Sequence, residues 1–519
     1  MKDRLKIAKV TTFDAQSIFS FHYEFSSICK KYYFDFVLLG IIIFISLTTW
    51  YSLTEGILGG DSFLYLLYSY KTAFWKQPFA IGSFEASAVT YGNLFSRLFG
   101  VTFPLYFWAE LIVMNIINIL FYVFVFILTK KRLVAFTATL FLAVNYFGNW
   151  DMYSNHSYTF FLERIINAPW MILSLMFLHL YLTQNKIKYF STSVIFYTLG
   201  VGLGHFSILF SPTFIFYPIT YKFFKSQKNK YSKSNEIWIV IIYLFTGASI
   251  MFLQQLSLPG FGPKWSFIDF MMHPNKYQHI DKIVAQLVNW SQYPMILKSL
   301  DNNAMNGIIN VGTRDTISLY VVVIYFLAGI LIYKKLQSYR AILFTCAFSV
   351  TAIFYLNSYF NQYAMLYYTG SSRYLYYPTF ILVLFWVLFL WAAFFDAKNV
   401  LVKLVGIGIV GMYVLVNISL IRGNFEWVNV WNIPTKKMHS YIVDIRDSLK
   451  ENTLVVGESP LIGHQEAVFF TEQLGRGQIV YSTTSKNYDD WEKLASSASH
   501  LIFLVYNNTC KCIIETANK

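Results

Sequence analysis

The chain has 519 residues, of which 56% are hydrophobic and only 13% are charged, and its mean hydropathy is +0.46. A soluble globular protein carries about 25% charged residues, so this composition excludes that class and predicts an integral membrane protein. The net charge of +14 does not indicate a nucleic-acid partner, because the lysines form short clusters between apolar runs, which is how orientation in a membrane is encoded.

Residues 1–32 are basic and mostly polar, beginning with MKDRLKIAKV, and they precede the first long apolar run. No small-residue cleavage site follows that run, so the pattern predicts a membrane anchor and not a removable signal peptide. We therefore expect residues 1–32 to form an N-terminal tail ahead of the membrane domain.

Long apolar runs recur through residues 33–422 and predict an all-α polytopic membrane domain. A bilayer core needs roughly 20 apolar residues per helix, and a window of this length gives about eleven transmembrane helices. The third run is short, and the fifth and sixth adjoin each other, so their limits are the least sharply defined. The predicted spans are 33–53, 101–128, 133–147, 166–183, 189–204, 206–223, 236–254, 316–333, 341–357, 376–395 and 400–421.

The distribution of lysine and arginine predicts how these spans are oriented. If the N-terminus is cytoplasmic, the short basic clusters all fall on the cytoplasmic side: TKKR (129–132), NKIK (185–188), KFFKSQKNKYSK (222–233), YKKLQSYR (333–340) and DAKNVLVK (396–403). The opposite segments are poorer in basic residues: 54–100, 148–165, 255–315, 358–375 and the tail from 423. The pattern therefore predicts a cytoplasmic N-terminus and a C-terminal domain outside.

The first outer loop, 54–100, has an unusual composition for a segment outside the membrane. It contains two amphipathic pieces, FLYLLYSYKTAFW and AVTYGNLFSRLFG, separated by the helix-breaking stretch QPFAIGSFEAS. Amphipathic helices with aromatic residues on one face prefer the membrane interface. We therefore expect interfacial helices in this loop, covering a groove that opens to both lipid and water.

Residues 423–519 differ from the membrane domain in composition and period. TLVVGE (453–458), QIVYST (478–483) and HLIFLVYN (500–507) are β-rich runs separated by helix-like stretches. This alternation predicts a small extracytoplasmic α/β domain with a partly parallel sheet. Cys510 and Cys512 form a C-x-C pair that could close only a small ring, so a disulfide and two free thiols are both compatible with the sequence. No spacing of cysteine and histidine indicates zinc.

Ionisable residues are scarce on the predicted outer side, and several lie beside the ends of spans, a pattern that indicates a functional site. Those near the ends of spans are Asp61, Glu85, Asp151, His156, Glu163, Arg164, His205, Arg314, Asp315 and Arg373. Glu110 lies well inside an apolar run, so its carboxyl group must be paired or face a cavity.

Segments on the predicted outer side follow one another in a characteristic order. The first loop opens with GGDSFLYL (59–66), continues through KQPFAIG and closes with NLFSRLFG; FLERIINAPW (161–170), GHFSILFSP (204–212) and SSRYLYYP (371–378) follow. In this order the chain resembles the polyprenyl-phosphate-dependent glycosyltransferases of the GT-C type, a superfamily that includes protein O-mannosyltransferases and aminoarabinose transferases. The resemblance covers about residues 30–420. It implies a sugar donor carried on polyprenyl phosphate.

The resemblance also implies a role for Asp61, because the first outer loop supplies an essential acid in this superfamily. Asp61 would position or deprotonate the acceptor nucleophile while the sugar leaves its lipid phosphate. Many relatives carry a second acid directly after the first, whereas this chain has Ser62. Metal binding and substrate subgroup therefore do not follow from the resemblance.

The departing phosphate needs cationic or donor groups to balance its charge. Arg164 and Arg373 suit this task because a guanidinium binds phosphate oxygens with a bidentate fork, and His205 could donate to the same oxygens. The supplementary acids, which could also hold a divalent cation such as Mg²⁺ or Mn²⁺, are Asp151, Glu163 and Glu85.

Each of these residues also has a purely structural interpretation. Asp61 follows two glycines at a helix start, where aspartate is a good N-cap, and capping and catalysis can coexist. Arg164 and Arg373 could pair with lipid phosphates at the interface, and His205 could hydrogen-bond between helices. Asp151 and Glu163 could be solvated loop residues.

Taken together, the sequence predicts a membrane glycosyltransferase that moves a hexose or pentose from a polyprenyl-phosphate donor to a lipid, glycan or protein acceptor. The expected location is the outer face of a bacterial plasma membrane. A transporter or flippase for lipid-linked sugars is the main alternative, but it should show broken helices at the membrane midplane and paired halves. A repeat-unit polymerase with the 255–315 loop as its acceptor region is a third interpretation.

Overall fold

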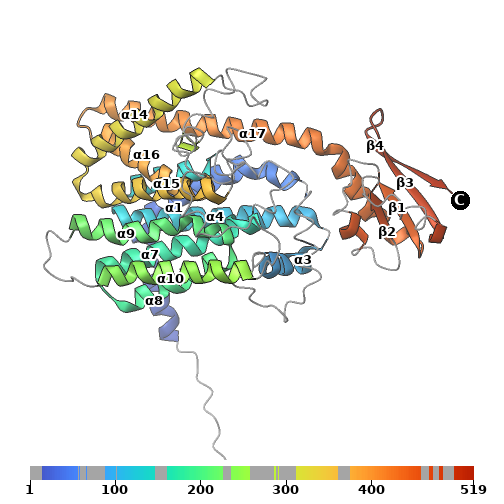
Figure 1. The fold of residues 1–519 in the computed structure, drawn as a ribbon, viewed down its shortest axis with the longest axis horizontal. Helices are drawn as coiled ribbons and strands as arrows, with labels where there is room; N and C mark the ends of the chain where they lie inside the picture. Colours follow the sequence, from blue (N-terminus) through green and yellow to red (C-terminus); the bar gives the residue numbers. More distant parts are fainter. Residues whose placement is uncertain are drawn as a thin grey trace, which may run out of the picture.

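The structure is a computed structural model in which most of the described residues are helical (Figure 1). It describes residues 15–56, 58, 66, 88–100, 102–145, 161–225, 235–256, 286, 287, 290, 311–360, 375–457, 467–471, 479–482 and 496–518.

Each predicted span overlaps a helix, and these helices pack side by side in one bundle (Figure 1). Their bounds are α1 (Ala15–Trp50), α4 (Phe103–Thr129), α5 (Arg132–Ala143), α7 (Ala168–Gln184), α8 (Ile187–Leu203), α9 (Ser211–Lys225), α10 (Asn235–Leu256), α14 (Val311–Lys335), α15 (Arg340–Phe360), α16 (Tyr376–Leu390) and α17 (Val400–Ile445). Short helical segments join them: η1 (Tyr51–Glu55), η2 (Ala88–Gly92), α3 (Asn93–Phe99), η4 (Ile165–Asn167), η5 (His205–Phe210), η7 (Gln337–Tyr339), η9 (Trp391–Phe395) and η10 (Arg446–Ser448).

Within the described residues, six helical segments are long and apolar enough to cross a membrane. They are Tyr32–Glu55, Phe103–Thr129, Phe161–Gln184, Gln337–Asn357, Tyr376–Phe395 and Val400–Gly423. The coarse prediction of a mostly helical chain with membrane-length helices is therefore confirmed. The count of about eleven spans, which rests on a window of roughly 20 apolar residues, stays a prediction.

Local signals in the sequence set the limits of several helices. α4 and α7 each carry a proline in their first turn, where the missing N–H has no helical partner to lose. Both helices end at a residue in the left-handed conformation, Lys130 with φ 57° and Asn185 with φ 53°. Such a residue stops the helix and lets the chain turn back, so α5 and α8 follow after short basic turns.

The basic turns between helices meet at one end of the bundle, which we call the basic end. The Tyr339 hydroxyl, between α14 and α15, donates to the Thr129 carbonyl at the end of α4 (2.8 Å). Lys131 lies in the turn between α4 and α5. Its ammonium group is 4.3 Å from the centroid of the ring of Trp391, the residue that follows α16. Lys335 also donates to the backbone beyond α16 (3.1 Å). Clusters far apart in sequence thus share one side, as the positive-inside pattern requires.

A buried carboxylate fixes α1 to its neighbours at the basic end. Asp35 of α1 is 7% exposed and accepts hydrogen bonds from the Tyr122 hydroxyl (2.7 Å) and from Arg132 Nε (2.9 Å). A carboxylate at this burial is tolerated because a cation and a hydroxyl both satisfy it. The network ties α1 to α4 and α5.

The predicted domain boundary at residue 423 falls inside α17, which continues without interruption to Ile445 and contains Pro434. Beyond the membrane-length part, Met438 and Ile442 are fully buried. The Tyr441 hydroxyl donates to Glu515 Oε2 (2.8 Å), and Lys437 Nζ donates to the Lys511 carbonyl. The same helix therefore joins the bundle to the sheet domain (Figure 1).

The described strands of the C-terminal domain form a four-stranded sheet in the order β2-β1-β3-β4. Its strands are β1 (Thr453–Gly457), β2 (Ile479–Ser482), β3 (His500–Asn507) and β4 (Cys512–Asn518). β1 pairs in parallel with both β2 and β3, which confirms the partly parallel sheet predicted from the sequence. The antiparallel edge strand β4 was not expected, because CIIETAN lacks a long β-rich run.

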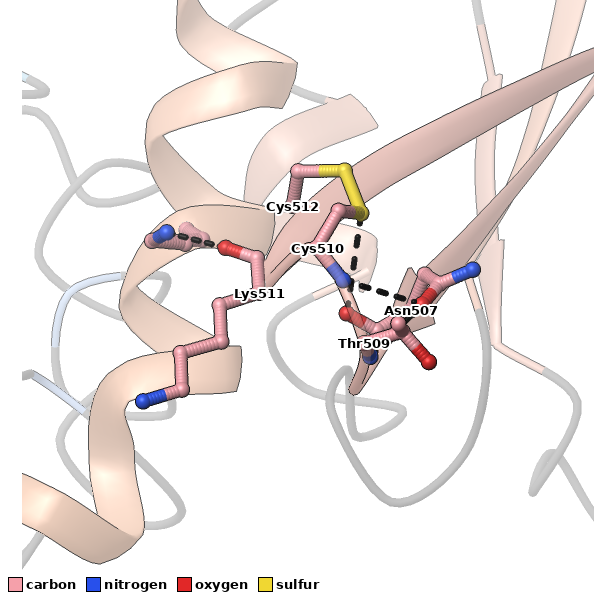
Figure 2. Close-up of a disulfide and its surroundings, with 6 residues drawn as sticks. Asn507, Thr509, Cys510, Lys511 and Cys512 are labelled. Carbon is pink, nitrogen blue, oxygen red and sulfur yellow. Dashed lines mark hydrogen bonds between the residues drawn. A yellow bond between two sulfur atoms is a disulfide. The ribbon is translucent and has the colours of Figure 1, made fainter.

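Cys510, in the turn after β3, forms a disulfide with Cys512, the first residue of β4, so the structure selects one of the two states that the sequence left open (Figure 2). The turn is also held by Asn507, whose Oδ1 accepts from the backbone N–H groups of Thr509 (2.7 Å) and Cys510 (3.3 Å).

The sheet domain rests on the N-terminal end of α4 through an aromatic cluster around His439. The His439 ring of α17 is 3% exposed, and its centroid lies 6.0 Å from that of Phe103 and 5.2 Å from that of Phe470. Burial lowers the pKa of His439 from 6.5 to about 3, because these apolar surroundings disfavour the charged imidazolium. The imidazole is therefore neutral in the folded protein at physiological pH.

This shift predicts that acid weakens the junction. An unfolded histidine binds a proton below about pH 6.5, whereas folded His439 stays neutral down to about pH 3. The free energy of unfolding therefore keeps its full value above pH 6.5 and decreases as the pH falls from 6.5 toward 3. Between pH 7 and pH 5 the free energy of unfolding should decrease by about 2 kcal/mol. The measurement is the thermal unfolding midpoint at both pH values for the wild type and for His439→Phe, which keeps an aromatic ring but cannot titrate. An equal pH-dependent drop in both proteins would show that His439 is not responsible.

Candidate functional site

The candidate site lies at the end of the bundle opposite the basic end, where the sheet domain also sits (Figure 1). We call it the site end. Of the residues that the sequence singled out there, Asp61, Glu85, Asp151, His156 and Arg373 lie outside the described residues. His205 begins η5, and its backbone alone is described; Glu163 and Arg164 are described in full.

Glu163 and Arg164 form an ion pair just before α7. Arg164 Nη1 donates to Glu163 Oε2 at 2.6 Å, and the Arg164 side chain is only 3% exposed, against 14% for Glu163. A cation this deeply buried requires a partner charge, which Glu163 provides. The acid is the member of the pair that reaches the surface, so it is the one that can meet a proton or a cation.

Arg164 also connects this segment to η5. Its guanidinium carbon lies 3.9 Å from the centroid of the Phe206 ring, a cation–π contact. Gly204 allows the two segments to approach, because a Cβ at this position would collide with the Asn167 side chain and with Ser207 Oγ. The Asn167 amide in turn donates to the Leu162 carbonyl (3.2 Å).

A third segment completes the cluster through Tyr377 at the start of α16. Its hydroxyl donates to the Arg164 carbonyl (3.2 Å) and shares a 2.5 Å hydrogen bond with Ser207 Oγ. Tyr377 and Ser207 are both buried, and Phe210 stacks on the tyrosine ring at 5.7 Å. The segments FLERIIN (161–167), GHFS (204–207) and LYYP (375–378), which are far apart in sequence, therefore meet around one arginine.

The end of the first outer loop lies against the same cluster. Phe95 of α3 packs on Phe161, with ring centroids 5.8 Å apart, and Trp170 Nε1 donates to the Tyr91 hydroxyl (2.9 Å). Nearer its start, the loop has two fully buried leucines, Leu58 and Leu66, on either side of the GGDSF sequence. The loop is thus fixed to the core both before and after Asp61.

Glu110 adds a second acid to this end of the bundle. It lies in the first part of α4 and is fully buried, and neither carboxylate oxygen has a hydrogen-bond partner among the described residues. A carboxyl group in such surroundings is expected to be part of a functional site.

The described residues contain no group of three or more His, Cys, Asp and Glu side chains placed to hold a metal ion. The chemistry that the described cluster offers is a buried cation, paired with Glu163 and stacked on Phe206, with its backbone carbonyl held by the Tyr377 hydroxyl. Sequence reasoning found Glu163 and Arg164 but missed Ser207 and Tyr377. The only sequence feature that could have indicated them is their position within the segments GHFSILFSP and SSRYLYYP, which contribute to the resemblance described above.

A comparison with models of known protein families finds no match to this chain, and a comparison with curated proteins finds no similar sequence.

Proposed function

We propose that this protein is a membrane glycosyltransferase that moves a sugar from a polyprenyl-phosphate donor to an acceptor at the outer face of the membrane. The observation that carries the proposal is the convergence of FLERIIN, GHFS and LYYP (375–378) around Arg164, beside the end of the first outer loop. These are the segments through which the chain resembles the GT-C glycosyltransferases.

The distribution of charge supports an outward orientation of the site. The basic turns meet at one end of the bundle, and the Arg164 cluster lies at the other, since Arg164 precedes α7 whereas the basic turn at 185–188 follows it. Basic clusters favour the cytoplasmic side, so the site and the sheet domain belong outside and the N-terminus inside.

The proposed step transfers the sugar by a single displacement. The acceptor oxygen or nitrogen bonds to the anomeric carbon, the bond from that carbon to the phosphate oxygen breaks, and the phosphate keeps the electron pair. Asp61 takes the acceptor proton, and Arg373 and His205 balance the charge that develops on the phosphate. Arg164, which is buried and paired with Glu163, holds the segments that carry these groups.

The test uses purified full-length protein in vesicles with a panel of polyprenyl-phosphate hexoses and pentoses, together with a membrane extract as the source of acceptor. Mass spectrometry should detect released polyprenyl monophosphate and a glycosylated product, neither of which forms in protein-free vesicles. Movement of the intact lipid-linked sugar across the bilayer without cleavage would instead identify a transporter. Release of polyprenyl diphosphate with growing chains would identify a polymerase.

A further inference from the structure

An apolar cavity of about 520 Å³ lies between α14, α15 and α16, in the half of the bundle toward the basic end. Its walls include Phe326, Gly329 and Tyr333 of α14 and Phe344 and Val350 of α15. Phe326 is 67% exposed and Tyr333 is 39% exposed, so the described walls of the cavity open on the apolar exterior of the bundle. In a membrane this opening faces lipid.

Two polar groups of the described lining are engaged with the protein. The Thr351 hydroxyl donates to the Ala347 carbonyl (2.9 Å), and the Tyr325 hydroxyl accepts from Trp386 Nε1 (2.9 Å). The remaining described lining is dominated by aromatic and aliphatic side chains. An occupant that needs hydrogen bonds would therefore lose them here, whereas a hydrocarbon chain would not. The cavity has the volume and the chemistry for a lipid tail.

Positive charge surrounds the end of the cavity nearest the basic turn. Arg340, the first residue of α15, stacks its guanidinium 4.0 Å from the centroid of the Tyr333 ring and donates from Nε to the Tyr333 carbonyl (3.0 Å). Its Nη groups have no hydrogen-bond partner among the described residues. Lys334 and Lys335 precede it, and the segment 333–340 contains no carboxylate.

We propose that this cavity binds one anionic glycerophospholipid from the leaflet at the basic end. One acyl chain fills the space between α14 and α15, and the phosphate lies beside Arg340 and Lys334. Arginine suits this position because its planar fork matches phosphate oxygens while its face stacks on an aromatic ring. The site is separate from the proposed transfer chemistry, which takes place at the other end of the bundle, so it does not depend on the proposed function.

Filling the cavity tests the proposal. Gly329 lines the cavity, and a Cβ built there meets no heavy atom within 4 Å, so Gly329→Leu places a side chain in the space without a collision. Gly408 on α17 has the same open surroundings and lies outside the cavity, which makes Gly408→Leu the matched control. Ala347→Leu fills the cavity from the α15 side and serves as a second variant if Gly329→Leu does not fold.

The full-length proteins are purified in mild detergent, incubated with an equimolar mixture of phosphatidylglycerol and phosphatidylcholine, and examined by native mass spectrometry. Wild type and Gly408→Leu should each retain one phosphatidylglycerol, whereas a folded cavity-filling variant should retain at least tenfold less. Arg340→Gln should keep a lipid but lose the preference for phosphatidylglycerol. Equal retention by the filled variant, equal retention of both lipids by the wild type, or a polyprenyl phosphate bound in their place would overturn the proposal.

Discussion

Arg164→Lys is expected to lower sugar transfer at least tenfold while the protein still inserts and folds. Lysine keeps the positive charge beside Glu163, so the carboxylate remains paired. It cannot, however, lie flat on Phe206 while it holds Glu163 Oε2, because a point-like ammonium has neither the planar face nor the fork of arginine. Losing one charge-assisted hydrogen bond of about 1.5–3 kcal/mol corresponds to a factor of roughly 10 to 10².

The matched control for this variant is Arg132→Lys. Arg132 also pairs with a carboxylate, that of the buried Asp35, through Nε at 2.9 Å, but it lies at the basic end of the bundle. Transfer from the lipid-linked sugar should therefore continue at close to the wild-type rate in Arg132→Lys. If both lysine variants were fully active, or if both lost activity equally, the ion pair at the site end would have no special part in transfer.

Tyr377 shows why the site could be predicted only in part. The pairing of Glu163 with Arg164 links neighbours in sequence, so their types and position beside an apolar run were enough to single them out. The bond between Ser207 and Tyr377 joins positions that are 170 residues apart. The sequence around Ser207 and around Tyr377 does not distinguish them from the many other serines and tyrosines of this chain. No local pattern therefore specifies which two hydroxyl groups form a hydrogen bond.

The burial of the Arg164 side chain also could not be predicted from the sequence. Arg164 was predicted as a phosphate ligand at the depth of lipid head groups, but the structure places its side chain at 3% exposure, held by Glu163 and Phe206. Position beside a span end gives the depth of a residue in the membrane. It does not tell whether the side chain points to lipid or into the bundle, which depends on how helices rotate against one another.

The fold, too, could be predicted from the sequence only in part. The membrane-length helices were predictable because a long apolar run has few other stable states in a bilayer. The extension of α17 beyond residue 423 was not, since WVNVWNIPTKK is mixed in polarity and contains Pro434, which removes a helical hydrogen bond. Contacts with the sheet domain, such as that between Tyr441 and Glu515, stabilise this part of the helix.

Asp61→Asn is expected to fold and insert normally and to lose transfer activity by a factor of roughly 10² to 10⁴, which is what a positioned acid or base supplies. The substitution separates two roles of this residue. Asparagine caps a helix about as well as aspartate, so local stability should be unchanged if Asp61 is a cap. It cannot take the acceptor proton or carry a negative charge, so a catalytic role would be lost.

The control is Asp396→Asn, which removes an exposed carboxylate at the basic end of the bundle, far from the proposed chemistry. It should transfer sugar at the wild-type rate. Asp61→Ala adds a readout for capping, because alanine should also lower helix stability by about 0.5–2 kcal/mol.

The initial rate of polyprenyl phosphate release by purified Asp61→Asn protein, measured against wild type in the same vesicles, tests the central claim most directly. A rate at least a hundredfold below wild type, from protein with an unchanged thermal unfolding midpoint, is the predicted result on the basis of general acid–base catalysis, which supplies roughly 10² to 10⁴. Release at the wild-type rate would contradict the account, because the acid in the first outer loop would then be a helix cap and not a catalyst.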